Sequence, residues 1–71
     1  MSDEVTAREI DQFRTRCAAY GVSDQRCQCA VDRSVEQLTP AEFRANLTVM
    51  ADGGATSEVA AILLACKNAG S

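Results

Sequence analysis

Cys17-Ala-Ala-Tyr-Gly21-Val-Ser-Asp-Gln-Arg-Cys27-Gln-Cys29 is the segment that holds three of the four cysteines in this 71-residue chain, and Cys66 is the fourth. A chain this short is expected to form one domain, residues 1–71. Its core alone supplies only a few kcal/mol of net stability, so such domains usually need a further constraint. Disulfides would add about 2–4 kcal/mol each, and one between this segment and Cys66 would close the fold.

The sequence has seven Lys and Arg residues, ten Asp and Glu residues and no histidine, so its net charge is −3. Because no basic stripe is available to neutralise phosphates, the sequence disfavours nucleic-acid binding. The absence of histidine removes the commonest general base and metal ligand, and it excludes Ser/His/Asp and Cys/His catalytic arrangements. We therefore expect a protein that is not an enzyme and binds no metal or cofactor. No apolar run is long enough for membrane insertion.

Capping residues and glycines predict four helices with short connections. A side chain at the start of a helix can accept a hydrogen bond from an unpaired main-chain amide of the first turn. Thr39-Pro-Ala-Glu42 is the clearest such signal in the sequence. The expected starts are Asp3 or Thr6, Ser23 or Asp24, Thr39, and Thr56 or Ser57, and the expected ends are Gly21, Leu38, Asp52 and Gly70. The first three helices each have one apolar face. These faces are Ile10, Phe13, Cys17 and Tyr20; Cys27, Val31, Val35 and Leu38; and Phe43, Leu47 and Met50. The sequence thus predicts an all-α fold, a compact four-helix bundle or array stapled by disulfides.

The last expected helix contains an eight-residue run, residues 59–66, without any charged or strongly polar side chain. A helix that is apolar all round is normally buried on most sides. We therefore favour a central position for this helix. The alternative is that it offers Leu64 and its neighbours to a second chain.

The four cysteines allow three interpretations. Structural disulfides are favoured, because an even number of cysteines in a short chain is typical of exported disulfide scaffolds. Cys27-Gln-Cys29 is too tight for the usual zinc knuckle, but its place in a first helical turn keeps a thiol-dependent metal-binding or redox role open. Buried reduced thiols are the third interpretation.

The two cysteines of Cys27-Gln-Cys29 are about 200° apart around a helix, so we expect them to bond in two directions. Cys27 and Cys66 both lie on core faces, which favours the pairs Cys17–Cys29 and Cys27–Cys66. The alternative pairs, Cys17–Cys27 and Cys29–Cys66, would be preferred if the first helix packs on the core face of the second.

An aromatic residue precedes the first cysteine by four positions, and a glycine, a Cys-x-Cys, a Thr-x-x-Glu-Phe, a glycine turn and a last cysteine follow. These are Phe13, Cys17, Gly21, Cys27-Gln-Cys29, Thr39-Pro-Ala-Glu42-Phe43, Gly53-Gly54 and Cys66. In this combination, residues 13–66 resemble a family of small exported bacterial proteins with no agreed activity. Members carry a signal peptide or lipoprotein signal, so the resemblance implies a periplasmic or cell-surface location. Met1-Ser-Asp-Glu carries no such signal, and a native start at Met1 would favour the cytoplasm.

The favoured function is a non-enzymatic, disulfide-stabilised binding or accessory protein of the bacterial envelope, periplasmic or extracellular, with a protein partner. Val49 and Leu64 are expected to face outward and to mark the contact surface. The alternatives are a thiol-dependent metal-binding or redox partner protein that uses Cys27 and Cys29, and a small cytoplasmic inhibitor or regulatory protein with reduced cysteines. Asn46-Leu-Thr48 matches a glycosylation acceptor, which in the middle of a helix we interpret as chance.

Overall fold

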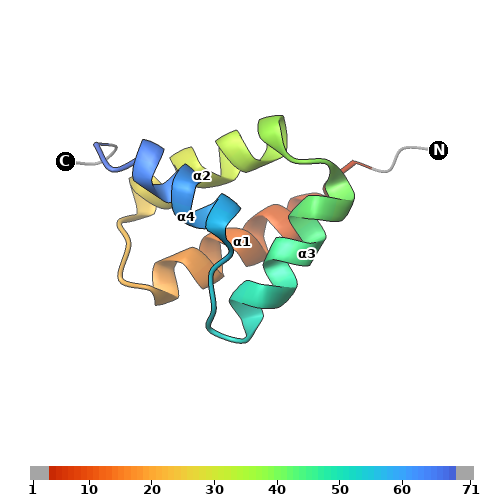
Figure 1. Cartoon of the computed structure of the whole chain (residues 1–71), viewed down its shortest axis with the longest axis horizontal. Helices are drawn as coiled ribbons and strands as arrows, with labels where there is room; N and C mark the ends of the chain where they lie inside the picture. The colour runs from red at the N-terminus through yellow and green to blue at the C-terminus, as the bar shows by residue number, and fades with distance from the viewer. Residues whose placement is uncertain (1–3, 69–71) are drawn as a thin grey trace.

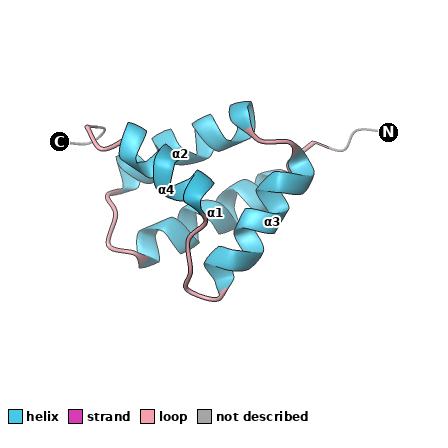
Figure 2. Cartoon of the chain, viewed as in Figure 1, coloured by secondary structure: helices cyan, strands magenta, loops and turns pink. Residues whose placement is uncertain are grey.

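A computed structural model describes residues 4–68. In this part of the chain there are four helices and no strand, as predicted (Figure 2). The helices are α1 (Ala7–Ala19), α2 (Asp24–Gln37), α3 (Pro40–Ala51) and α4 (Ser57–Ala65). The expected end of the last helix at Gly70 lies outside the described residues, and α4 ends earlier, with Cys66 as its C-cap.

The helices begin where the capping signals predicted. Thr6, Ser23, Thr39 and Thr56 are the N-caps, and each side chain accepts a hydrogen bond from a main-chain amide in the first turn. Thr6 with Glu9 and Thr39 with Glu42 form complete capping boxes. Gly21 and Gly53 follow α1 and α3 with φ of 80° and 84°. This left-handed conformation ends a helix cheaply only when the residue is glycine.

The second helix is the one that joins the others. α2 packs against α1, α3 and α4, and α1 also packs against α3 (Figure 1). The Phe13 ring of α1 stacks on the Phe43 ring of α3, with 5.4 Å between centroids. The buried apolar residues are Phe13, Cys17, Cys27, Ala30, Val31, Phe43, Met50, Val59, Ile62 and Cys66.

The predicted apolar faces are not buried throughout, because one position is exposed and four are only partly buried. Val35 is 42 % exposed, and the neighbouring Ser34 is buried in its place. Its hydroxyl donates to the Ala30 carbonyl at 2.7 Å, which satisfies the polar group inside the core. On α3, Asn46 is fully packed in the core, whereas Leu47 is only partly buried.

The expected central position of the last helix is wrong. α4 packs mainly on α2, and only Val59 and Ile62 within it are buried. Ala60, Ala61, Leu64 and Ala65 are all exposed. The run of apolar residues is rich in alanine, whose small side chain costs little to expose, so one side of the helix stays open.

The cysteines form two disulfides, Cys17–Cys27 and Cys29–Cys66, with Cα atoms 5.8 and 5.9 Å apart, and none is free. The favoured pairing, Cys17–Cys29 with Cys27–Cys66, is therefore wrong and the alternative is correct. Because α1 packs on the core face of α2, Cys17 meets Cys27 there, and both are fully buried. Cys29 points in another direction, toward α4, as the spacing predicted.

Candidate interaction surface

The exposed side of α4 consists of apolar side chains. Leu64 is 65 % exposed, more than either of the other exposed large apolar residues, Val35 and Val49. Ala60, Ala61 and Ala65 lie beside it and are also exposed. We call these four residues the α4 face. It carries no charge, although charged side chains lie at both ends of the helix.

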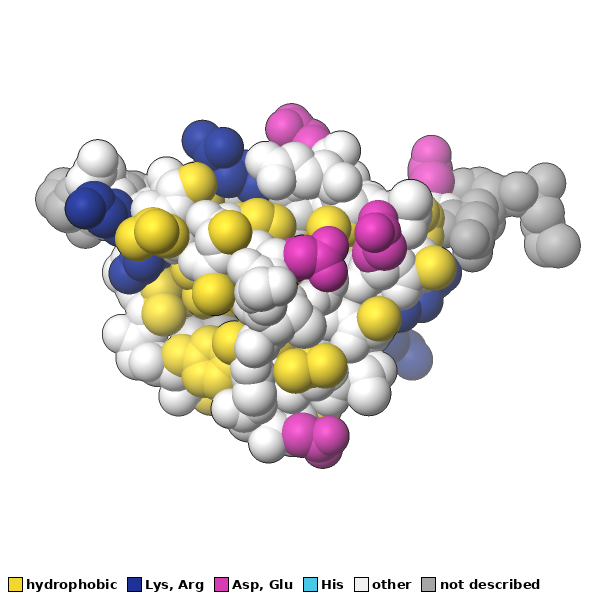
Figure 3. All heavy atoms as spheres, in the orientation of Figure 1, with side chains coloured by type: hydrophobic (Ala, Val, Ile, Leu, Met, Phe, Trp, Pro, Cys, Tyr) yellow, Lys and Arg dark blue, Asp and Glu magenta, His cyan; other side chains and the backbone are white. Residues whose placement is uncertain are grey.

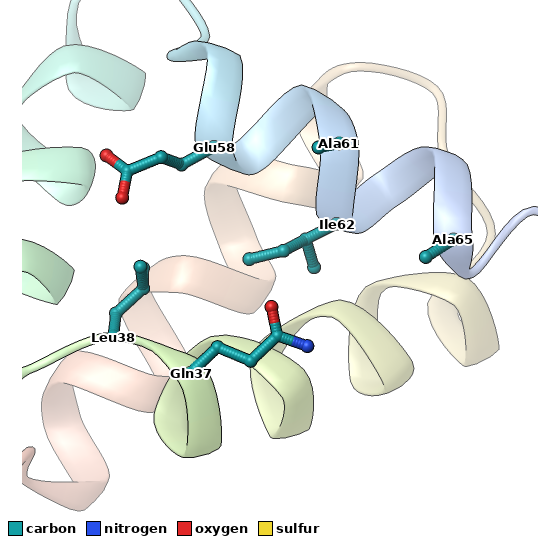
Figure 4. Close-up of a pocket in the computed structure, with 6 residues that line it drawn as sticks. All are labelled: Gln37, Leu38, Glu58, Ala61, Ile62 and Ala65. Carbon is teal, nitrogen blue, oxygen red and sulfur yellow. The ribbon is translucent and has the colours of Figure 1, made fainter.

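A shallow groove borders the α4 face where α4 approaches the end of α2. It is lined by Gln37, Leu38, Glu58, Ala61, Ile62 and Ala65. In Figure 4 the side chains of Gln37 in α2, of its C-cap Leu38 and of Ile62 in α4 extend into the space between the two helices. Glu58 extends from the start of α4, away from the Ala65 end. The groove therefore has an apolar floor and a carboxylate at one end.

The C-terminal end of α4 is held on α2 by a covalent and a polar link. The covalent link is Cys29–Cys66. In the polar link, Arg26 Nε and Nη2 donate to the Leu63 carbonyl oxygen at 3.0 and 2.8 Å. The Leu63 carbonyl also accepts from the Cys66 main-chain amide at 3.2 Å. Because the last carbonyls of a helix carry partial negative charge, a guanidinium is a favourable second donor.

The N-terminal end of α4 is held on α3. The Thr56 hydroxyl, whose oxygen also caps α4, hydrogen-bonds to the Asn46 carbonyl oxygen Oδ1. The Asn46 amide donates to the Glu42 carbonyl at 2.8 Å. In the loop before α4, the Tyr20 hydroxyl donates to the Gly54 carbonyl. With both ends fixed, the α4 face is presented by a short helix that cannot easily rotate.

The roles of Arg26 and Asn46 in holding α4 were not predicted from the sequence. Their partners in these links, Leu63 and Thr56, are 37 and 10 positions away, so helical periodicity contains no trace of the bonds. Arg26 lies in the first turn of α2, where a cation interacts unfavourably with the helix dipole. This unfavourable position was the one local sign that its guanidinium binds a group outside its own helix. For Asn46, the burial of the amide also makes the Asn46-Leu-Thr48 acceptor inaccessible in the folded chain.

The two predicted contact residues do not form one surface. Leu64 is part of the α4 face, whereas Val49 lies in the last turn of α3 and is 37 % exposed. Figure 1 places the C-terminal ends of α3 and α4 well apart, α3 at the lower edge and α4 at the upper left. The structure thus separates Val49 from the α4 face and its groove.

A strong ion pair lies away from this surface and joins α1 to α3. Arg44 Nε donates to Glu9 Oε2 at 2.6 Å. This bond, together with the hydrogen bond from the Thr6 main-chain amide, lowers the pKa of Glu9 from its ordinary 4.5 to about 2. Arg14 and Asp24 form a second pair, at 3.3 Å and largely exposed, which contributes little to stability.

Both cysteines of Cys27-Gln-Cys29 are oxidised in the structure. Cys27 and Cys29 belong to different disulfides, so they do not offer two thiols to one site. Among residues 4–68, no cluster of three or more His, Cys, Asp or Glu could hold a metal ion. Nor does any helix in this range have the length and hydropathy needed to cross a membrane.

Residues 4–68 thus form a four-helix fold with two disulfides and an exposed apolar face on α4. Comparisons with protein-family models, with curated proteins and with solved structures found no match to this chain. The resemblance to exported bacterial proteins stays a prediction.

Proposed function

We propose that this chain is a non-enzymatic binding or accessory protein of the bacterial envelope, periplasmic or extracellular, and that it binds a protein through the α4 face. The observation that carries the proposal is the 65 % exposure of Leu64 among exposed alanines. Exposing such a group to water is unfavourable, and burial of a leucine against a partner returns about 1.5–3 kcal/mol.

The two disulfides support the proposed compartment. Disulfides persist in the periplasm and outside the cell, whereas cytoplasmic thiols are kept reduced. Both bridges lie between helices, and closing them requires an oxidising environment during folding. The net charge of −3 supports a protein partner over a nucleic acid, because the phosphate backbone demands clustered cations.

The rigidity of α4 supports the proposed contact surface. The Cys29–Cys66 bridge and the Arg26–Leu63 hydrogen bonds fix one end, and the Thr56–Asn46 hydrogen bond fixes the other. A surface that is ordered before binding loses less conformational entropy when the complex forms. The groove beside the face offers room for a partner's apolar side chain.

The test is capture of a partner from bacterial envelope extract with three immobilised proteins: wild type, Leu64→Asp and the matched control Val49→Asp. Both variants place a carboxylate at an exposed apolar position, but only one alters the α4 face. We expect wild type and Val49→Asp to retain the same protein and Leu64→Asp to lose it. Retention by Leu64→Asp, with circular dichroism showing an intact fold, would eliminate the α4 face as the contact surface.

A further inference from the structure

The two disulfides differ in how well solvent reaches them. The Cys17–Cys27 disulfide, which we call the core bridge, joins α1 to α2, and both of its residues are fully buried. The Cys29–Cys66 disulfide, which we call the α4 bridge, joins α2 to the C-cap of α4, and Cys29 is only partly buried. Exposed disulfides are the labile and regulatory ones, because a thiolate must reach a sulfur atom to reduce the bond. A reductant in solution therefore reaches the α4 bridge first.

The two bridges also differ in how much of the fold must open to release them. α4 has nine residues, and Val59 and Ile62 are the only buried ones within it. A helix shorter than about 12 residues is marginal without its packing, and such an element can open locally while the rest of the domain stays folded. The core bridge lies between α1 and α2, which contribute Phe13 and Val31 to the buried core. Release of the core bridge thus requires the core itself to open.

Few other contacts hold the last turn of α4. Apart from the α4 bridge, the hydrogen bonds from Arg26 to the Leu63 carbonyl attach this turn to α2. Figure 3, in the same orientation as Figure 1, shows apolar side chains at the surface over α4, so water borders this helix. Once the α4 bridge is open, the position of the last turn depends on one guanidinium and on the packing of Ile62.

We propose that the α4 bridge is a redox switch: a dithiol reductant opens it, the core bridge stays closed, and the last turn of α4 loosens from α2. The inference rests on the proposed function, in which a rigid α4 face is the contact surface. Reduction of the α4 bridge removes part of that rigidity, so we expect it to weaken binding of the partner.

The reaction is a thiol–disulfide exchange. A thiolate of the reductant attacks Sγ of Cys29, the more exposed residue of the α4 bridge. The S–S bond breaks with its electron pair on Cys66 Sγ, which takes up a proton. The second thiol of the reductant then displaces Cys29 from the mixed disulfide, and Cys29 is protonated in turn. One protein disulfide and one dithiol thus become two protein thiols and one cyclic disulfide.

The test is graded reduction of the folded, oxidised chain by dithiothreitol, stopped with excess N-ethylmaleimide in denaturant and followed by trypsin digestion. Opening of the α4 bridge alone labels peptide 45–67 and leaves peptide 17–26 linked to peptide 27–33, whereas opening of the core bridge labels peptide 17–26. We expect the α4 bridge to open about tenfold faster or more, so that a form with only the core bridge accumulates.

Arg26→Met tests whether opening of α4 controls the reaction. Because this variant lacks the hydrogen bonds to the Leu63 carbonyl, we expect its α4 bridge to open about threefold faster or more, with no change at the core bridge. Arg33→Met, at an exposed position of α2, is the matched control and is expected to react as wild type does. Hydrogen exchange in a chain with both Cys29→Ala and Cys66→Ala measures the loosening directly, and we expect faster exchange in α4 than in α1 and α2.

Three results would overturn this inference: loss of both bridges together or of the core bridge first, unchanged exchange in α4 without its bridge, or undiminished partner capture by the form with only the core bridge. If one of these is found, capture of a protein by oxidised wild type but not by Leu64→Asp would leave the proposed function standing.

Discussion

Arg26 donates two hydrogen bonds to the main-chain carbonyl of Leu63, at 3.0 and 2.8 Å, beside the Cys29–Cys66 disulfide. Arg26 precedes Cys29 by three positions on α2, and Leu63 in α4 precedes the C-cap Cys66 by three positions. Neighbouring turns of the two helices are thus joined once by a guanidinium and once by sulfur. This double link holds the last turn of α4, from which Leu64 projects.

Removal of the guanidinium is expected to weaken this link. Arg26→Met keeps most of the aliphatic packing but leaves the Leu63 carbonyl without its charged donor. We expect the free energy of unfolding to fall by about 1–2 kcal/mol, as for partly buried hydrogen bonds to charged groups. Urea unfolding measures the loss, and Arg33→Met, an exposed position on the same helix, is the control. Equal stability of both variants would contradict the role of Arg26.

The disulfide pairing can be read from a single variant. With the pairs Cys17–Cys27 and Cys29–Cys66, Cys29→Ala leaves Cys66 as the free thiol. With the pairing favoured by the sequence, the same variant would free Cys17. Acid quenching, alkylation and trypsin digestion separate these outcomes, because the two cysteines fall in different peptides, 17–26 and 45–67. Trypsin alone cannot assign the wild-type bridges, since Cys27 and Cys29 share one peptide.

Asn46 is expected to be sensitive to a nearly isosteric change. Asn46→Asp removes the donor to the Glu42 carbonyl and places a carboxylate where the side chain is 2 % exposed. Burial of an unpaired charge costs several kcal/mol, or it shifts the pKa of the new carboxyl upward. We expect a loss of at least about 2 kcal/mol in unfolding free energy at neutral pH, less at acidic pH. Gln12→Glu, the same chemical change on exposed α1 surface, is expected to be nearly neutral.

The ion pair between Glu9 and Arg44 predicts a dependence of stability on pH. The pKa of Glu9 is about 2 in the folded chain and 4.5 ordinarily, so folding favours the ionised form. Its stabilising contribution is complete above pH about 4.5 and is lost as the pH falls toward about 2. We expect the difference in unfolding free energy between wild type and Glu9→Gln to shrink over that range. A Glu9 carboxyl that titrates near 4.5 by NMR would contradict the strength assigned to this pair.

Local signals predicted the helices well, and tertiary contacts explain what was missed. The N-caps at Thr6, Thr39 and Thr56 depend on residues three positions away, so the sequence contains the whole interaction. On α2, steps of three or four allow either Ser34 or Val35 on the core face. Hydropathy favours valine, but the Ser34 hydroxyl is satisfied by its own helix, and this permits its burial.

The candidate surface was predicted only in part. Leu64 was identified because it stands in an apolar run, but the same run led to the wrong expectation of a central helix. Hydropathy shows that α4 is apolar and cannot show which of its sides meets another helix. The disulfide pairing depends on the same missing information, since it follows from which helix packs on the core face of α2.

The role of the two disulfides is best tested by thermal unfolding of the oxidised and reduced chains. The bridges join cysteines 10 and 37 positions apart. Because they restrict the unfolded chain, they are expected to stabilise the folded state by about 3 and about 4 kcal/mol. A shift of about 4–8 °C per kcal/mol is typical at this size, so we expect the melting temperature to fall by at least about 20 °C on reduction. A variant with all four cysteines changed to alanine controls for the reductant itself. Equal melting temperatures for the oxidised and reduced chains would contradict the disulfide-stapled fold.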